Sequence, residues 1–297
     1  MKIYDCFMFS DEKMLLEVRL NLLNKFVDKF IIAEAAYFHN GEAKNLNFNY
    51  KDYPEFKNKI EYLIVKDQPP NLISTGRNDS KKELEEKNII NSIRRDNFQR
   101  DTLNNSLKSL NKEDIILIND LDEIPNLEDY NLNKIDNEII IFKQKMFYYK
   151  FNLLYENFIW FGTKATKKKN FISPQWLREI KNKNYPFWRI DTLFSKKKYS
   201  NIKFIENGGW HFTCIKKPED IHNKLLTFAH HQDYESSQIS LKQLKKIISE
   251  KKVLYDHQSD KKQNNKWFSD KTLKKIEIQK LPSFFSKNIE KYENWLD

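Results

Sequence analysis

Apolar and polar residues follow one another along the first part of the chain in the pattern of alternating strands and helices. Residues 2–9 are rich in Ile, Tyr and Phe, which predicts a strand. Four apolar side chains then recur at spacings of three and four residues, which predicts an amphipathic helix ending near Asp28. An apolar run at 30–33 predicts a buried parallel strand. The four helical positions are Leu16, Leu20, Leu23 and Val27.

The alternation continues to a fourth strand. Residues 60–65 predict the third strand, and Ser80 with Glu83 has the S-x-x-E form of a capping box. A helix is predicted from there to about Leu110, broken once, and residues 115–118 predict the fourth strand. This order predicts an α/β fold with a mostly parallel sheet, helices on both faces, and ligands bound at the carboxyl ends of the strands.

The pattern changes from about Ile139. Residues 139–151 and 157–161 are aromatic-rich and predict further strands, whereas the chain from about Pro218 predicts helices. The sequence has no internal repeat and no Gly/Ser linker. We therefore expect one continuous domain with a helical C-terminal extension rather than two independent domains.

Composition narrows the class of protein. The 297 residues include 5 glycines, whereas average usage of about 7% would give roughly twenty. Neither G-x-x-x-x-G-K-[ST] nor G-x-G-x-x-G can be written anywhere, so a bound nucleotide needs another means of holding its diphosphate. With 39% hydrophobic residues the chain can form a core. Cys6 and Cys214 lack the spacing of zinc or redox sites, and a reduced compartment is expected.

The net charge of +10 comes from 52 basic and 42 acidic residues. Its clusters lie at 167–169, 196–198 and 242–252, and they fit a solvated lysine surface, an anionic lipid headgroup or a phosphorylated substrate. Charge alone does not decide among these readings. The sequence shows neither a signal peptide nor an apolar run of 18 residues, so we expect a soluble, cytoplasmic protein.

The sharpest local feature is an apolar strand that ends in two carboxylates. Asp120 and Asp122 follow residues 115–118, and side chains two apart in an extended chain point to the same side. Two carboxylates facing one point suit Mg²⁺ or Mn²⁺, which take oxygen ligands. The alternative is that Asp122 and Glu123 cap a following turn, with Pro125 in its first turn.

Two further features involve a turn and a helix. Gly208 and Gly209 stand side by side before Trp-His, which predicts a backbone with positive φ or a close approach to a neighbour. His211 could complete a metal shell or be an ordinary histidine. On the long helix, Arg95 and Gln99 are four apart and share a face that suits phosphate or base-edge recognition, or is simply a charged surface.

Taken together, these stretches resemble glycosyltransferase family 17, the family of the β-1,4-mannosyl-glycoprotein β-1,4-N-acetylglucosaminyltransferases and their bacterial relatives. The resemblance runs through most of the chain, and the tract 179–204 matches poorly. The matching stretches, in chain order, are Tyr4–Phe7, Leu16–Leu20, Val27–Glu34, Phe98–Asp101, Asp120–Pro125, Phe147–Tyr149, Ser173–Arg178, Gly209–Phe212, Lys224 and Phe228–His230.

The resemblance implies a GT-A fold, a UDP-sugar donor, UDP-N-acetylglucosamine above all, and transfer with inversion to a hydroxyl of a glycan acceptor. It also implies an Mn²⁺ or Mg²⁺ ion bound directly by Asp122, with Asp120 contacting the metal through water or the donor ribose, and His211 approaching from the C-terminal side. The residues it suggests for donor binding are Glu34, Arg95, Gln99, Arg100, Asp120, Arg178 and Trp210.

Inversion requires a carboxylate base that takes the acceptor proton. Asp191 and Glu206 lie in the expected acceptor-side region and are the two candidates. The implied division is a catalytic domain at 1–217, made of a nucleotide-binding part at about 1–125 and an acceptor-side part at about 126–217, with a helical extension at 218–297 packed on the same domain.

Two other classes of protein remain as alternatives. A metal-dependent nucleotidyl or phosphoryl transferase would also use Asp120 and Asp122, and a non-enzymatic basic protein would bind nucleic acid. The favoured reading needs no nucleic acid and no transmembrane segment. The glycosyltransferase interpretation is compatible with a lipid-linked acceptor and with peripheral contact with the inner face of a membrane.

Overall fold

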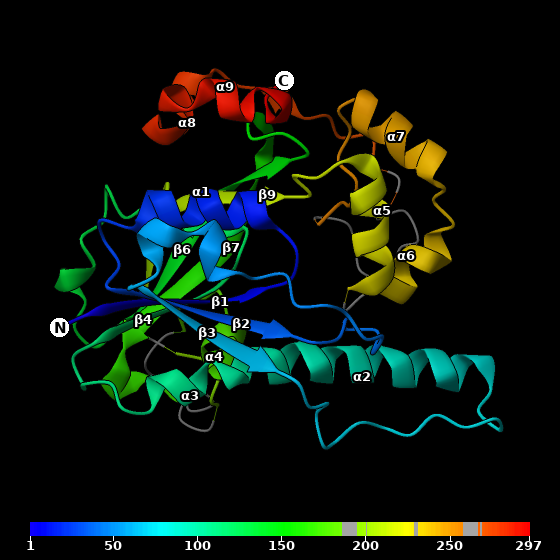
Figure 1. The fold of residues 1–297 in the computed structure, drawn as a ribbon, viewed down its shortest axis with the longest axis horizontal. Helices are drawn as coiled ribbons and strands as arrows, with labels where there is room; N and C mark the ends of the chain where they lie inside the picture. The colour runs from blue at the N-terminus through cyan, green and yellow to red at the C-terminus, as the bar shows by residue number, and fades with distance from the viewer. Residues whose placement is uncertain (186–194, 200, 229–230, 258–266, 268) are drawn as a thin grey trace.

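The computed structural model describes residues 1–185, 195–199, 201–228, 231–257, 267 and 269–297. Its first four strands pair in parallel in the order β3-β2-β1-β4, which confirms the parallel arrangement predicted from the sequence (Figure 1). These strands are β1 (Ile3–Phe9), β2 (Lys29–Ala35), β3 (Ile60–Val65) and β4 (Ile115–Asp120).

Helices cover both faces of this sheet (Figure 1). Phe7 and Phe9 of β1 pack in the core beneath α1, whereas Tyr4 and Cys6 pack with residues of α3 and α4 on the other face. Successive side chains of a strand point to opposite faces, which explains why the buried strands are apolar throughout. The helices are α1 (Lys13–Leu23), α2 (Lys81–Thr102), α3 (Asn104–Leu107) and α4 (Pro174–Glu179).

The predicted helix boundaries are partly right. The capping box of Ser80 and Glu83 forms at the start of α2, and the long helix is broken once, between α2 and α3. Helix α1 ends at Leu23 rather than near Asp28, because the chain turns there and the Asp28 carboxylate accepts a hydrogen bond from the Ile3 backbone nitrogen. Val27 is still buried in the core.

The second half of the chain adds a mixed extension to the sheet. Strand β7 runs antiparallel to β4 and β6, and β9 lies parallel to β6 and antiparallel to β5, giving the full order β3-β2-β1-β4-β7-β6-β9-β5. These strands are β5 (Glu123–Pro125), β6 (Ile139–Tyr148), β7 (Leu153–Lys167), β8 (Ile202–Ile205), β9 (Gly209–Thr213) and β10 (Lys274–Lys275). Strand β7 is longer than the predicted 157–161, because its polar residues at 163–167 are buried beside β4.

The chain after Pro218 contains five α-helices within the described residues, and it also joins the sheet. Strand β10 pairs with β7, and Phe285 and Tyr292 pack in the same core as α1. The helices are α5 (Pro218–Thr227), α6 (His231–Ser237), α7 (Leu241–Ser249), α8 (Ser283–Lys287) and α9 (Ile289–Tyr292). Short 3-10 turns lie at Tyr50–Asp52, Pro54–Phe56, Leu132–Lys134, Lys168–Asn170, Ile278–Lys280 and Glu293–Trp295.

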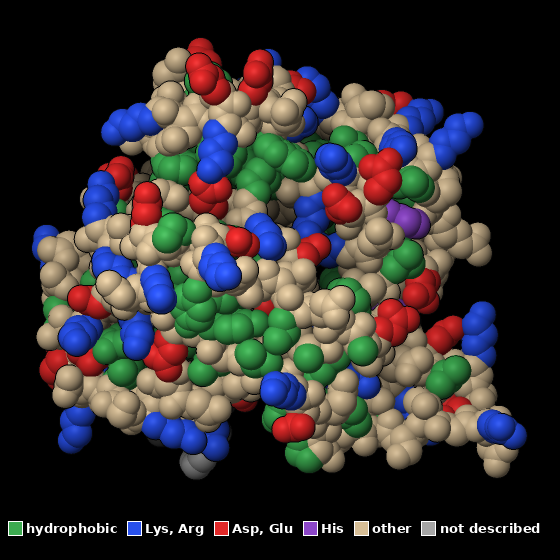
Figure 2. Space-filling view, in the orientation of Figure 1, with side chains coloured by type: hydrophobic (Ala, Val, Ile, Leu, Met, Phe, Trp, Pro, Cys, Tyr) green, Lys and Arg blue, Asp and Glu red, His purple; other side chains and the backbone are tan. Residues whose placement is uncertain are grey.

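The surface carries both signs of charge. On the face drawn in Figure 2, acidic and basic side chains are interspersed rather than separated. Among the described residues, no helix combines the length and the apolar character that a membrane span requires.

Candidate active site

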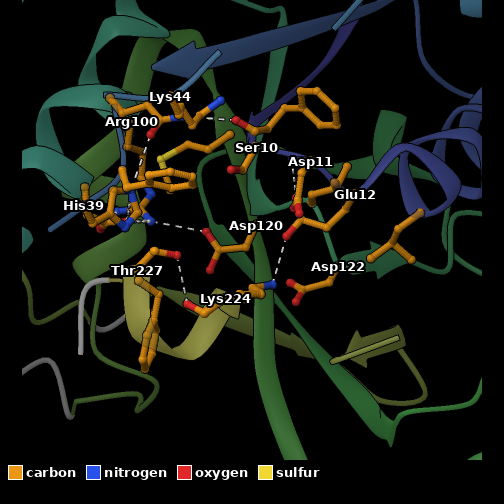
Figure 3. A pocket seen from close by; sticks show the side chains of 18 of the residues that line it. Ser10, Asp11, Glu12, His39, Lys44, Arg100, Asp120, Asp122, Lys224 and Thr227 are labelled. Atoms are coloured by element: carbon orange, nitrogen blue, oxygen red, sulfur yellow. Dashed lines mark hydrogen bonds and ion pairs between the residues drawn. The ribbon is translucent and has the colours of Figure 1, made fainter. Parts of the chain in front are cut away.

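A cavity of about 710 Å³ opens where β1, β2 and β4 end (Figure 3). This is the position at which open α/β sheets bind ligands, and the volume suits a small-molecule site. Six of the residues proposed from the sequence line it together. They are Gln99, Arg100, Asp120, Asp122, Arg178 and His211.

Asp120 is held between two guanidinium groups. Its Oδ2 accepts a hydrogen bond from Arg178 Nη2 at 2.7 Å, and its Oδ1 accepts one from Arg100 Nη2 at 3.2 Å. Burial opposes ionisation of the carboxyl, but the charges of Arg178 and Arg100 outweigh it and hold the pKa of Asp120 well below its usual range. Asp120 is therefore a carboxylate whose oxygens already have cationic partners.

The carboxylate of Glu123 holds the guanidinium group of Arg178 in place. Both of its oxygens accept hydrogen bonds from Arg178, at 2.7 and 2.8 Å, and the indole nitrogen of Trp160 donates to the same carboxylate. The turn or helix that Asp122 and Glu123 were expected to cap does not follow, because residues 123–125 form β5; the Glu123 carboxylate instead accepts a hydrogen bond from the Asp120 backbone nitrogen at 3.1 Å, across the turn before β5. Its role as an anchor was missed; its place directly after the paired aspartates was the only signal.

Asp122 and His211 face one another across the strand pair β5–β9. Asp122 precedes β5, and its carbonyl oxygen accepts a hydrogen bond from the Phe212 backbone nitrogen at 2.9 Å. His211 Nε2 lies 3.5 Å from Asp122 Oδ1, and the imidazole lies against the ring of Trp160 with centroids 4.7 Å apart. Its Nδ1 is buried and has no hydrogen-bond partner within the described part of the chain.

The two glycines before His211 are required by close packing, as the sequence predicted. Gly209 has φ +131°, and a Cβ there would lie 2.1 Å from the carbonyl oxygen of Ile124. A Cβ on Gly208 would lie 2.8 Å from the carbonyl oxygen of Ile205. Gly209 therefore lets β9 approach β5 closely enough to bring His211 beside Asp122, and Gly208 lets the preceding turn approach β8 and β6.

The pair Asp122 and His211 fits a divalent cation that also takes ligands from a substrate. Two ligand atoms each about 2.1 Å from one ion lie roughly 3 to 4 Å apart, and the observed separation is 3.5 Å. No group of three or more His, Cys, Asp and Glu side chains in the described ranges is placed to hold a metal ion. Further ligands would have to be oxygens of a bound molecule or water.

An ion pair connects the loop after β1 with helix α5. Lys224 Nζ lies 2.9 Å from Glu12 Oε1, and Lys216 pairs with Asp11 beside it. Burial opposes ionisation of Glu12, but the ammonium groups of Lys224 and Lys216 hold its pKa well below the usual range. Lys224 was noted in the sequence only as part of the family pattern, because nothing in the sequence relates it to a residue 212 positions earlier.

Glu34 lies behind the cavity wall rather than in it. The buried carboxylate pairs with Lys44 at 2.6 Å and accepts a hydrogen bond from the Tyr62 hydroxyl at 2.8 Å. The backbone nitrogens of Asn47 and Phe48 also donate to it. Lys44, not Glu34, lines the cavity, so Glu34 acts here by fixing its neighbour.

Three other proposed residues do not line the cavity. Arg95 donates to Gln68 Oε1 at 2.7 Å and to the His39 carbonyl oxygen at 3.2 Å. Trp210 is half-buried against the core on β9. Glu206 is 70% exposed and pairs with Lys143.

Two proposed residues remain, Asp191 and Gln99. Asp191 lies outside the described residues. Gln99, although it lines the cavity, donates to the Ala33 carbonyl oxygen at 2.9 Å and so also ties α2 to β2.

The fold and the cavity define an α/β protein with an enzyme-like site at the carboxyl ends of its strands. The chain matches the model of Glycosyltransferase family 17 over residues 1–297, and it belongs to this family. No curated protein matches the chain. Among solved structures, the crystal structure of HddC from Yersinia pseudotuberculosis is similar, with 9% sequence identity, 70% of this chain and 92% of that chain covered, and a TM-score of 0.34.

Proposed function

We propose that the protein transfers N-acetylglucosamine from UDP-N-acetylglucosamine, with inversion and with the help of Mn²⁺ or Mg²⁺, to a hydroxyl group of a glycan acceptor. Membership of the glycosyltransferase family supports the transfer of a sugar. The observation that carries the finer proposal is the pairing of Asp122 with His211 beside Asp120, in a cavity that also holds Arg100 and Arg178. The GT-A type of fold belongs to the same proposal.

Cationic groups around Asp120 suit the diphosphate of such a donor. Arg100 and Arg178 are planar donors that match phosphate oxygens, and Lys44 adds an ammonium group to the same cavity. Asp122 and His211 would hold the divalent cation, with Asp120 reaching it through water or binding the donor ribose. The cation would neutralise the negative charge that develops on the departing diphosphate.

Transfer with inversion also requires a base. The acceptor oxygen forms a bond to the anomeric carbon, the bond from that carbon to UDP breaks, and a carboxylate takes the acceptor proton. Asp191 and Glu206 are the candidates that the sequence suggested. Because Glu206 does not line the cavity and pairs with Lys143 at the surface, we propose Asp191 as the base.

Two alternatives make different predictions. A nucleotidyl or phosphoryl transferase would turn over a nucleoside triphosphate, whereas the proposed enzyme hydrolyses a UDP-sugar slowly when no acceptor is present. A nucleic-acid binder would lose affinity steeply with salt and would be indifferent to chelator. The face drawn in Figure 2 carries interspersed acidic and basic side chains rather than the basic patch with which a protein binds nucleic acid.

The proposed partners follow from the same reading. The protein would act in the cytoplasm, and its basic cluster at 242–252 would suit contact with the inner face of a membrane that carries a lipid-linked acceptor. The cluster at 167–169 is less suited, because Lys167 is buried and both Lys167 and Lys169 pair with Glu113.

A thermal-shift screen of UDP-sugars with and without Mn²⁺ tests the function. A ligand that binds only the folded protein raises its melting temperature. We expect UDP-N-acetylglucosamine to raise it in the presence of Mn²⁺ and to lose this effect with EDTA. A shift by a nucleoside triphosphate alone, or no shift by any UDP-sugar, would contradict the proposal.

A further inference from the structure

Helix α5 presents one polar stripe to the cavity. Four of its residues are spaced by three, four and seven positions from the first, which places them on one face of a helix, and all four line the cavity. They are Asp220, Asn223, Lys224 and Thr227. Ile221 and Leu225 lie on the opposite stripe and are buried in the core formed with β6. The apolar stripe fixes the helix, and the polar stripe faces the ligand space.

Two side chains of the polar stripe have intramolecular partners, and the other two have none within the described residues. Lys224 is paired with Glu12, and the Thr227 hydroxyl donates to the Lys224 carbonyl oxygen at 3.2 Å (Figure 3). Across the residues that the structure describes, the side chains of Asp220 and Asn223 make no hydrogen bond or ion pair, and both are exposed. Their hydrogen-bonding groups are therefore available to a ligand in the cavity.

The chemistry of these two side chains disfavours a phosphate and fits hydroxyl groups. An ionised Asp220 offers acceptor oxygens alone and repels an anion, whereas Asn223 offers one acceptor and two donors. Sugar hydroxyls donate and accept, so a pair of them matches this combination.

The phosphate-binding character of the cavity lies elsewhere. Arg100 and Arg178 surround Asp120, and in Figure 3 Lys224 and Thr227 of α5 lie on the opposite side of Asp120 from Ser10 and Lys44. We propose that Asp220 and Asn223 form a subsite that binds hydroxyl groups of the acceptor sugar. This inference rests on the proposed function, because it takes the guanidinium side of the cavity as the donor side.

The test uses UDP, Mn²⁺ and p-nitrophenyl β-D-glucoside, β-D-galactoside and β-D-mannoside as probes. Binding of each glycoside to the full chain is measured by saturation-transfer NMR, and the affinity for UDP by calorimetry. We expect at least one glycoside to bind the wild type, and its Kd to rise at least tenfold in Asp220→Ala/Asn223→Ala. The UDP affinity is expected to stay unchanged, since neither side chain has an intramolecular partner within the described chain. The melting temperature should fall only slightly, because the variant loses one carboxylate in the first turn of α5.

Glu219→Ala is the matched control. Glu219 lies in the same turn of α5 but pairs with Lys245 at 2.6 Å and does not line the cavity, so glycoside binding should be unchanged. The conservative variant Asp220→Asn should lose less affinity than Asp220→Ala, because it keeps one acceptor oxygen.

Three results would overturn the subsite. They are no binding of any glycoside to the wild type, an unchanged Kd in the double variant, and a parallel loss of UDP affinity, which would assign the stripe to the donor. Failure of the proposed function is a separate result. Glycoside binding that depends on Asp220 and Asn223, without any stabilisation by UDP-sugars, would retain the subsite and remove the donor assignment.

Discussion

Arg19 and Asp5 form a fully buried ion pair directly beneath the candidate site. Arg19 Nη2 donates to Asp5 Oδ1 at 2.6 Å, and Arg19 Nε donates to Oδ2 at 2.8 Å. The remaining Arg19 nitrogen, Nη1, donates to the carbonyl oxygens of Glu123 at 2.7 Å and Leu121 at 3.2 Å. Helix α1 thereby holds the backbone on both sides of Asp122.

Replacing Arg19 by leucine should destabilise the protein strongly. The change leaves Asp5 buried without its cation, and breaking a buried pair in this way costs about 3–5 kcal/mol. Urea denaturation followed by circular dichroism measures the free energy of unfolding. Asp5→Leu/Arg19→Leu should recover part of the loss, since it removes both charges. A single variant within about 1 kcal/mol of the wild type would contradict the importance of this pair.

Asp122→Asn should abolish sugar transfer while leaving the unfolding curve nearly unchanged. The side chain lies at the cavity, and its replacement keeps shape but removes the charge that would hold a divalent cation. Transfer and Mn²⁺ titration are the measurements, and Asp136→Asn, at a position 73% exposed, is the control. Full activity in Asp122→Asn would remove the metal assignment.

The variant His211→Ala distinguishes a metal-binding role of His211 from a purely structural one. If His211 is a metal ligand, the variant should require more Mn²⁺ for half-maximal activity, because one ligand of the ion is lost. If it is only packed against Trp160, the loss should appear in stability instead. An Mn²⁺ titration curve identical to that of the wild type would return His211 to a structural role.

The sequence predicted those parts of the site that are local. The strand before Asp120 and the glycine pair before His211 could be recognised because periodicity, or the absence of a Cβ, acts within a few residues. The family resemblance connected these stretches, and it also suggested Arg178. Glu123, next to the paired aspartates, was considered only as a cap. Its carboxylate does accept a hydrogen bond from the Asp120 backbone nitrogen, but the sequence did not predict that it also holds Arg178.

The parts of the site that the sequence did not predict depend on contacts between residues far apart in the chain. Arg19 meets Asp5 and the carbonyl oxygen of Glu123 only once α1 packs on the sheet. Lys224 meets Glu12 across 212 positions, and charged side chains of this kind are usually solvated. Hydrophobic patterning does not show which lysine and glutamate will pair in a partly buried position, so these residues need the folded structure.

Lys224→Met should weaken the protein most at neutral pH. In the wild type, Lys224 and Lys216 keep the pKa of Glu12 below the unfolded value of about 4.3. The pair therefore stabilises the protein above about pH 4 and loses this effect as the pH falls further. Because Lys224 is partly exposed, the loss at neutral pH should be about 1 kcal/mol.

Denaturation of wild type and Lys224→Met between pH 7 and pH 3 measures this effect. The difference in stability should shrink below about pH 4. Lys274→Met, which removes an exposed pair with Glu156, should show little difference at any pH. A difference that stayed constant with pH would show that Lys224 acts through packing and not through the charge of Glu12.

Because of Lys164, the free energy of unfolding should increase as the pH rises above 7. Its side chain is buried on β7 and donates to the carbonyl oxygens of Arg178 and Ile180, at the end of α4. Burial, together with the nearby charge of Arg178, lowers the pKa of Lys164 to about 7. Between that value and the ordinary lysine pKa of about 10.4, the unfolded chain binds a proton that the folded chain does not.

Because the unfolded chain binds more protons than the folded chain over this interval, the free energy of unfolding increases as the pH rises. Lys164→Met carries no such charge, so the stability of the wild type relative to the variant should increase by about 2 kcal/mol from pH 7 to pH 9. Chemical denaturation at several pH values gives this difference directly and cancels the titration of the tyrosines, which both proteins share. Parallel profiles for the two proteins would mean that Lys164 is charged throughout, and that its contacts with the end of α4 are those of an ammonium group.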